Sequence, residues 1–159
     1  MMKRLIFTGL STLAIINASL LTVETIALAK NSSGGVGTVA TAGTLDAGRD
    51  HFINVNVESE PFERLRIVCV TFHKFSAIKV VDAATNQPIP HTIDLGFEEI
   101  NITFDQSLQV GKTVKIIIEN STVRGIGEGI TVPYRIFAFS NTFGEIPLGT
   151  ALVKTPDND

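Results

Sequence analysis

The chain has 159 residues, of which 13 are basic and 16 acidic, and its formal net charge at pH 7 is −3. This length suits one ordinary domain that is large enough to bury a core. An acidic chain without a basic run repels phosphate backbones, so nucleic acid is not an expected partner.

The first 29 residues have the layout of a secretory signal peptide. Two basic residues precede a mostly apolar stretch at 5–23, and Ala27 and Ala29 form a small-x-small cleavage site. Cleavage between Ala29 and Lys30 would leave 130 residues with a formal charge of −4 and no membrane segment. The alternative is an uncleaved N-terminal anchor, because the apolar run approaches the ~18 residues that a spanning helix needs. We expect an exported protein of the periplasm, the cell envelope or the extracellular medium.

The rest of the chain divides into three parts. Residues 30–48 are small and rich in glycine, and we interpret them as a flexible leader in which 36–40 could form an edge strand. Residues 49–154 form the predicted domain. Residues 155–159 are a polar tail that contributes nothing to a core.

Apolar residues of the domain recur with a period of two, which is typical of β-strands. Strands are predicted at residues 51–59, 64–73, 77–82, 99–104, 113–119, 131–139 and 146–153. The stretch 64–73 becomes apolar on both faces, which suits a central strand that is covered on both sides. Residues 83–90 contain Asn, Gln and two prolines and are predicted to be a loop. About seven or eight short strands with regular turn signals predict an all-β fold, a single antiparallel Ig-like β-sandwich, with a barrel as the alternative.

The most regular stretch, residues 100–120, predicts a β-hairpin. Alternating positions place five apolar side chains on its core face, namely Ile102, Phe104, Val114, Ile116 and Ile118. Polar residues between the strands, such as Asp105 and Gln106, are interpreted as the rim of the hairpin. Leu108 and Val110 are expected to fold back over the end of the sandwich.

The segments TFHKF, AIKVVD, ITFDQSLQVGKTVKIIIEN and FGEIPLGTALV occur in this order between residues 52 and 153. Together they resemble the DUF2808 family, a group of exported cyanobacterial proteins of unassigned function. The matching positions are Ile102, Thr103, Phe104, Asp105, Gln106, Gly111, Val114, Asn120, Tyr134, Leu148 and Gly149. The chain departs from the family pattern at Ser107, where a proline is usual, and at GEGITVPY, where a Gly-Gly pair is usual before the tyrosine. The resemblance implies export and fold class, and it brings no catalytic residues.

Histidine and cysteine residues give no recognisable site. His51, His73 and His91 lie at no zinc-ligand spacing and are expected at strand ends or on the surface. The single cysteine, Cys69, excludes an internal disulfide, and its valine neighbours predict that it is buried.

Catalytic and metal-binding patterns are equally weak. The chain has no G-x-S-x-G motif. Glu98 and Glu99 are adjacent on a predicted strand and would point to opposite faces, so they would not share a proton. Asp82, Asp94 and Asp105 near strand ends could supply oxygens to calcium, but they form no D-x-D-x-D-G loop. We predict a non-enzymatic protein with no cofactor and no bound metal.

A Gly-rich loop at residues 124–130 is the predicted recognition surface, because binding residues are often carried on loops of a rigid scaffold. It lacks the lysine of a phosphate-binding loop. The predicted binding residues are Arg124, Gly125, Gly127 and Glu128, with Asn120 and Tyr134 beside them. With no Trp and one Tyr in the chain, a carbohydrate site built on ring stacking is not expected.

The predicted function is contact, through a surface or a loop, with another component of the cell envelope. The partner would be an envelope protein or a polysaccharide. The alternative function is a small-ligand or glycan-binding module that uses the loop end at Gly125 to Gly129.

Overall fold

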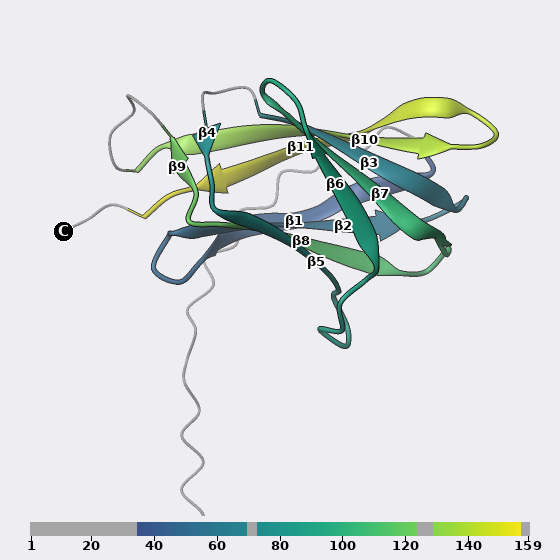
Figure 1. The fold of residues 1–159 in the computed structure, drawn as a ribbon, viewed down its shortest axis with the longest axis horizontal. Helices are drawn as coiled ribbons and strands as arrows, with labels where there is room; N and C mark the ends of the chain where they lie inside the picture. The colour runs from purple at the N-terminus through teal and green to yellow at the C-terminus, as the bar shows by residue number, and fades with distance from the viewer. Residues whose placement is uncertain (1–34, 70–72, 124–128, 157–159) are drawn as a thin grey trace, which may run out of the picture.

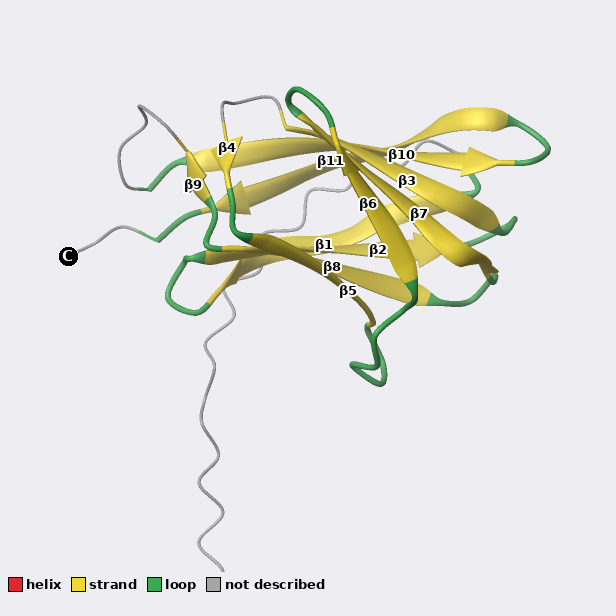
Figure 2. Cartoon of the chain, in the orientation of Figure 1, coloured by secondary structure: helices red, strands yellow, loops and turns green. Residues whose placement is uncertain are grey.

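A computed structural model describes residues 35–69, 73–123 and 129–156. These residues form strands and no helix, so no helix among them is long and apolar enough to cross a membrane (Figures 1 and 2). The strands are β1 (Gly37–Leu45), β2 (Asp50–Val57), β3 (Phe62–Cys69), β4 (His73–Lys74), β5 (Ala77–Asp82), β6 (His91–Leu95), β7 (Glu99–Leu108), β8 (Thr113–Glu119), β9 (Thr122–Val123), β10 (Thr131–Ser140) and β11 (Gly144–Lys154).

Two antiparallel sheets are stacked face to face (Figure 1). One has the strand order β1-β2-β8-β5, and the other has the order β11-β10-β3-β7-β6. Strands β4 and β9 pair separately at one end of the sandwich. The predicted all-β antiparallel sandwich is confirmed, and β3 is the central strand of its sheet as predicted. The prediction that β3 is covered on both sides is wrong, because alternate residues along it are only half-buried.

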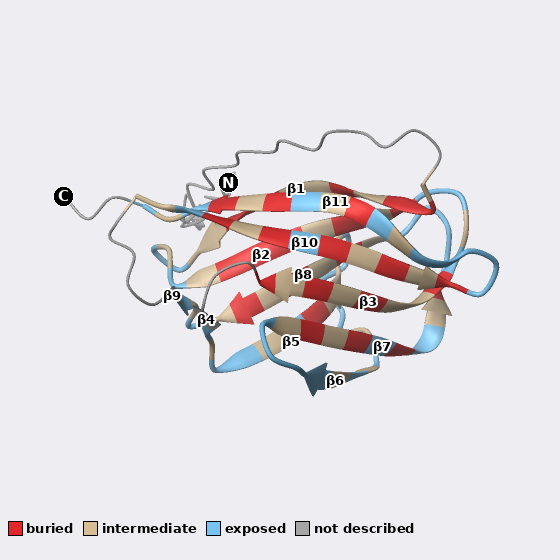
Figure 3. Cartoon of the chain, turned by 90° about the horizontal axis from the view of Figure 1, so that it is seen from above, coloured by how far each residue is buried: buried red, intermediate tan, exposed pale blue. Residues whose placement is uncertain are grey.

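The core lies between the two sheets and follows the period-two pattern of the sequence. Val114, Ile116 and Ile118 on β8 are fully buried, while the residues between them are half-buried. Ile102 and Phe104 on β7 are buried as predicted. Figure 3 shows the same alternation along β3 and β10. Burial of side chains of this size contributes on the order of 1.5–3 kcal/mol each before entropy is counted.

The structure contains more strands than the seven or eight predicted. The main addition is β6, which pairs with β7 over its whole length. Strand β7 also continues to Leu108, so Asp105 and Gln106 lie in a strand and not in a connection. Leu108 is buried as predicted, but the same prediction for Val110 is wrong, because its side chain is 49% exposed.

Much of the Gly-rich segment is part of the sheet. Residues 37–45 form the edge strand β1, which pairs with β2 and is longer than the strand considered at 36–40. A side chain at Gly37 would place Cβ 2.2 Å from the carbonyl oxygen of Asn56, so the close pairing requires glycine there. In the C-terminal tail, the backbone N–H of Thr155 donates to the carbonyl of Ile130 at 2.8 Å.

The strands β5 and β6 are the last strands of their sheets and lie on the same flank of the sandwich (Figure 1). The loop between them covers one end of this flank. There the N–H of Asp82 donates to the carbonyl of Gln87, and the N–H of Ile89 donates to the carbonyl of Val80. The opposite end of the flank lies near the turn between β6 and β7.

Candidate functional site

The predicted recognition loop lies mostly outside the described residues. Arg124, Gly125, Gly127 and Glu128 belong to the undescribed segment 124–128, so their role as binding residues remains a prediction.

Asn120, the predicted neighbour of this loop, is exposed and has a left-handed backbone with φ of 49°. Its N–H donates to the carboxylate of Asp50, and its side-chain amide donates to the hydroxyl of Ser76 at 2.8 Å. These contacts connect the end of β8 to the start of β2 and to the segment before β5. Asn120 therefore has a clear role in shaping the turn.

Tyr134 does not lie on a surface, in contrast to its predicted place beside the recognition loop. Its side chain is fully buried, and its hydroxyl lies 2.5 Å from Nδ1 of His51. The hydroxyl of Ser121 lies 3.1 Å from the same nitrogen. Burial raises the pKa of the Tyr134 hydroxyl well above its ordinary value, so this group stays protonated. The three side chains form a polar cluster that connects β2, β10 and the end of β8.

The histidines do not come together. His51 is the second residue of β2, so it lies at a strand end, which was one of the two expected places, and it is 1% exposed. His91 is half-buried at the start of β6, with Nδ1 2.6 Å from the carbonyl of Ile89. His73 lies in β4, whose backbone pairs with β9. No group of three or more His, Cys, Asp or Glu side chains that could hold a metal occurs among the described residues.

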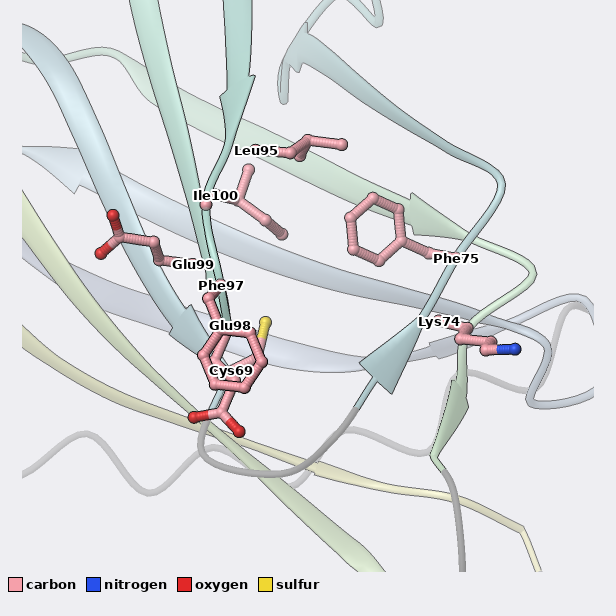
Figure 4. A pocket seen from close by; sticks show the side chains of 9 residues that line it. Cys69, Lys74, Phe75, Leu95, Phe97, Glu98, Glu99 and Ile100 are labelled. Atoms are coloured by element: carbon pink, nitrogen blue, oxygen red, sulfur yellow. The ribbon is translucent and has the colours of Figure 1, made fainter.

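An apolar cleft of about 400 Å³ lies at the end of the β5–β6 flank that is opposite to the loop between these strands. Its walls come from the end of β3, the segment between β4 and β5, and the β6–β7 hairpin. The lining residues are Cys69, Lys74, Phe75, Leu95, Gly96, Phe97, Glu98, Glu99 and Ile100. Figure 4 shows Phe75 facing Leu95 and Ile100 across the opening. We call this feature the aromatic cleft.

The most exposed apolar side chain of the cleft is Phe97, at 84%, and Leu95 is 58% exposed. Phe97 occupies a tight turn that the N–H of Gly96 closes by donating to the carbonyl of Glu99 at 3.0 Å. A side chain at Gly96 would put its Cβ 2.6 Å from Cγ of Glu99, so glycine lets the Glu99 side chain approach the turn closely. The N–H of Cys69 donates to the carbonyl of Glu98 at 2.8 Å and holds the turn against β3. Phe97 is therefore displayed on an anchored turn.

The charged groups around the cleft differ in their pairing. Glu99 forms an ion pair with Arg66 at 3.5 Å, and Arg66 also pairs with Glu145. Asp94 and Glu98 are exposed and take part in no ion pair within the described residues. Glu98 therefore lies unpaired at the rim of the apolar cleft, and Asp94 lies unpaired on β6, on the face opposite to Leu95.

Cys69 offers no reactive thiolate to this cleft. Its side chain is 3% exposed, and burial, together with the charge of Glu98, raises the pKa of the thiol to about 11 from 9.0. A thiol of this pKa is almost wholly protonated at neutral pH, and the thiolate is the nucleophile. The described groups of the cleft favour binding over catalysis.

Native Cys69 is expected to react with a thiol reagent far more slowly than the denatured chain. The difference of two pKa units lowers the thiolate fraction at pH 8 by about 100-fold, and burial slows access further. Because the folded pKa is raised, the stability that the protonated thiol contributes is complete below pH 9 and is lost as pH rises to about 11. Reagent kinetics with and without denaturant measure the first effect, and equal rates would contradict it.

A second pocket, of about 350 Å³, lies at the other end of the sandwich. It is lined by Asp82, Ile89, Pro90, Asp105, Gln106, Ser107, Leu108, Gln109 and Lys112. The carboxylate of Asp82 already accepts from Lys112 at 3.0 Å and from the N–H groups of Ala84 and Thr85. These bonds, above all that from Lys112, lower the pKa of Asp82. The geometry makes this carboxylate a loop-closing group. Asp105, the second calcium candidate, lines the same pocket, and Asp94, the third, lies apart on β6.

Sequence reasoning missed the aromatic cleft. The available signal was Phe97 between Gly96 and two glutamates, a large apolar residue in a short turn between two strands. The periodicity of the flanking strands could not show that the facing sheet leaves this turn uncovered.

No protein-family model and no curated protein matches the chain. The solved structures similar to it include BcpA, the major pilin subunit of Bacillus cereus, and a 35 kDa C-terminal fragment of GBS80, the major pilin of Streptococcus agalactiae. For BcpA the sequence identity is 11% and the TM-score 0.45, over 72% of this chain and 37% of that one. For GBS80 the values are 13% and 0.46, over 72% and 52%. The part of this chain that matches therefore covers 37% of the BcpA structure and 52% of the GBS80 fragment. By its own two sheets, it is an all-β sandwich protein.

Proposed function

We propose that this protein is an exported, non-enzymatic β-sandwich of the cell envelope or periplasm that binds another envelope protein through the aromatic cleft. The observation that carries the proposal is the display of Phe97, 84% exposed, on an anchored turn beside an apolar cleft. Single exposed apolar residues are ordinary, but contiguous apolar patches mark interaction sites in soluble proteins. Leu95 and Phe75 make the patch contiguous with the cleft.

A binding role agrees with the chemistry of the described residues. The Cys69 thiol is protonated, and Glu99 is engaged by Arg66. The polar cluster of His51, Ser121 and Tyr134 is largely buried and connects strands. The described site residues therefore favour contact over catalysis.

Export is supported by the sequence layout of residues 1–29, with its basic start, apolar stretch and cleavage site before Lys30. Membership of the DUF2808 family, whose proteins are exported, is part of the same proposal. It is carried by the segments that resemble that family.

Fractionation of the native cells, with intact mass measured in each fraction, tests export. We expect a mass that matches residues 30–159, in an envelope fraction that salt or muramidase releases. The same mass free in the medium would favour the soluble ligand-binding alternative. A membrane-bound mass that still includes residues 1–29 would contradict cleavage.

A photo-reactive phenylalanine analogue in place of Phe97 tests the contact site in cells. We expect it to cross-link one envelope protein, and we expect Leu95→Ser to abolish the cross-link because it removes an apolar wall of the cleft. The same analogue at Phe143 is the matched control, since Phe143 is 66% exposed on the β10–β11 turn. Equal cross-linking from both positions would contradict a role for the cleft.

A further inference from the structure

No other strand of the described residues covers the outer edge of β6, which leaves that edge open to strand pairing. Strand β6 is the last of its sheet and pairs on one side only, with β7. The edge of β5 on the same flank is partly covered, because Val80 and Asp82 bond to the loop at residues 87–89. An uncovered edge presents backbone donors and acceptors to a further strand.

The pairing with β7 defines which groups point outward. The carbonyl of Pro90 accepts from the N–H of Asp105, and the N–H of Gly96 donates to the carbonyl of Glu99. Hydrogen-bonded and non-bonded pairs alternate along an antiparallel ladder. The N–H and C=O groups of His91, Ile93 and Leu95 therefore point away from β7, toward the free edge.

The side chains of these same residues lie on the face of β6 that is turned toward the other sheet. Ile93 packs against the core, and Leu95 is 58% exposed where it reaches the aromatic cleft. In an antiparallel pair, residues directly opposite each other place their side chains on the same face. A strand added at this edge would thus send alternate side chains toward the cleft.

The charged residues near the edge of β6 indicate which kind of strand would pair there. Asp94 on β6 and Glu98 in the next turn are exposed and unpaired within the described residues, against one exposed lysine of the cleft, Lys74. A second copy of this chain carries a net charge of −3 and would bring the same two carboxylates to the contact. Charge complementarity favours a basic partner segment over self-pairing.

We propose that the edge of β6 takes up an extended, basic segment of a partner protein as an added strand, with one apolar side chain of that segment in the aromatic cleft. Main-chain bonds to His91, Ile93 and Leu95 supply affinity, and the cleft supplies specificity. This inference rests on the proposed function, because it specifies the partner of the same site.

The probe is the synthetic peptide acetyl-Lys-Val-Lys-Phe-Lys-Val-Lys-amide, titrated into the protein as isolated from cells. We expect saturable binding and slower hydrogen exchange, by about tenfold, at the amides of Ile93 and Leu95. The peptide with glutamate in place of lysine tests the charge. The peptide N-methylated at its valine and phenylalanine amides tests strand pairing, because these residues would donate to β6. We expect both to bind at least about tenfold more weakly, a difference of about 1.4 kcal/mol.

Two variants at one position separate backbone from side chain. Leu95→Pro removes an outward N–H and leaves the ladder to β7 intact, since proline is tolerated at an edge strand. Leu95→Ala removes the side chain and keeps the N–H. We expect that the peptide no longer slows hydrogen exchange at the Ile93 amide in the proline variant. We expect the alanine variant to bind the peptide more weakly and still to show slower exchange at Ile93 when the peptide is bound. Unchanged denaturation midpoints show that both variants are folded.

Equal binding of the lysine and glutamate peptides would overturn the charge assignment, and equal binding of the N-methylated peptide would overturn strand pairing. A dimer of the protein that Leu95→Pro dissociates would overturn the choice of partner in favour of a second copy. Absence of peptide binding with the Phe97 cross-link still present would refute this inference and leave the proposed function standing. Loss of both signals would refute both.

Discussion

Replacement of Phe104 by alanine is expected to lower the free energy of unfolding by about 3–5 kcal/mol. Phe104 lies on β7 and is 4% exposed, and its ring packs in the core between the sheets. Its removal leaves a cavity, because hydrogen-bonded neighbours on both sides of β7 limit how far the backbone can collapse. Urea denaturation of the variant and the unchanged protein measures the difference.

The control for this variant is Phe143→Ala. It deletes the same atoms from a side chain that is 66% exposed, and surface substitutions of this kind change stability by about 0.5 kcal/mol or less. Equal losses of unfolding free energy in the two variants would show that the buried Phe104 ring stabilises the fold no more than the exposed Phe143 ring does.

Tyr134→Phe is expected to destabilise the fold by about 1–3 kcal/mol, because it removes a buried hydroxyl and keeps the ring. The hydroxyl lies 2.5 Å from Nδ1 of His51, and His51 itself is 1% exposed. Loss of this partner leaves buried polar atoms less well satisfied. Thermal or urea denaturation at pH 7 measures the change.

A double-mutant cycle with Ser121→Ala separates the network from its parts. Ser121 contacts the same nitrogen of His51 at 3.1 Å, so we expect the two substitutions to be non-additive by about 0.5–3 kcal/mol. Additive effects would show that the two hydroxyls act independently.

The strand pattern could be predicted because successive side chains of a strand point to opposite faces of its sheet. In a two-sheet sandwich, buried and more exposed residues therefore alternate with a period of two. Strands β5 and β8 have the predicted bounds, residues 77–82 and 113–119. Strand β6 was missed because it is five residues long, follows a proline and keeps all of its side chains partly or fully exposed. Its formation depends on pairing with β7, which is a long-range contact and leaves no local signal.

The predicted site residues also show the difference between local sequence signals and long-range contacts. The closely spaced glycines at 124–130 predicted a recognition loop, and Tyr134 was predicted to lie beside it as a binding residue. The structure buries Tyr134 in the core. A lone tyrosine has the same local pattern whether it faces solvent or a buried histidine. Only the pairing of β10 with β3 and the approach of β2 bring its hydroxyl to His51.

By itself the sequence determined the fold class, the central position of β3 and the burial of Cys69. These depend on local periodicity and on the transfer of apolar side chains out of water, which each segment carries in its own composition. The tertiary structure alone decided which turn is displayed, which edge is free and which carboxylates are unpaired. Those properties depend on where one sheet stops covering the other, and among the described strands of the facing sheet none buries Phe97, which is 84% exposed.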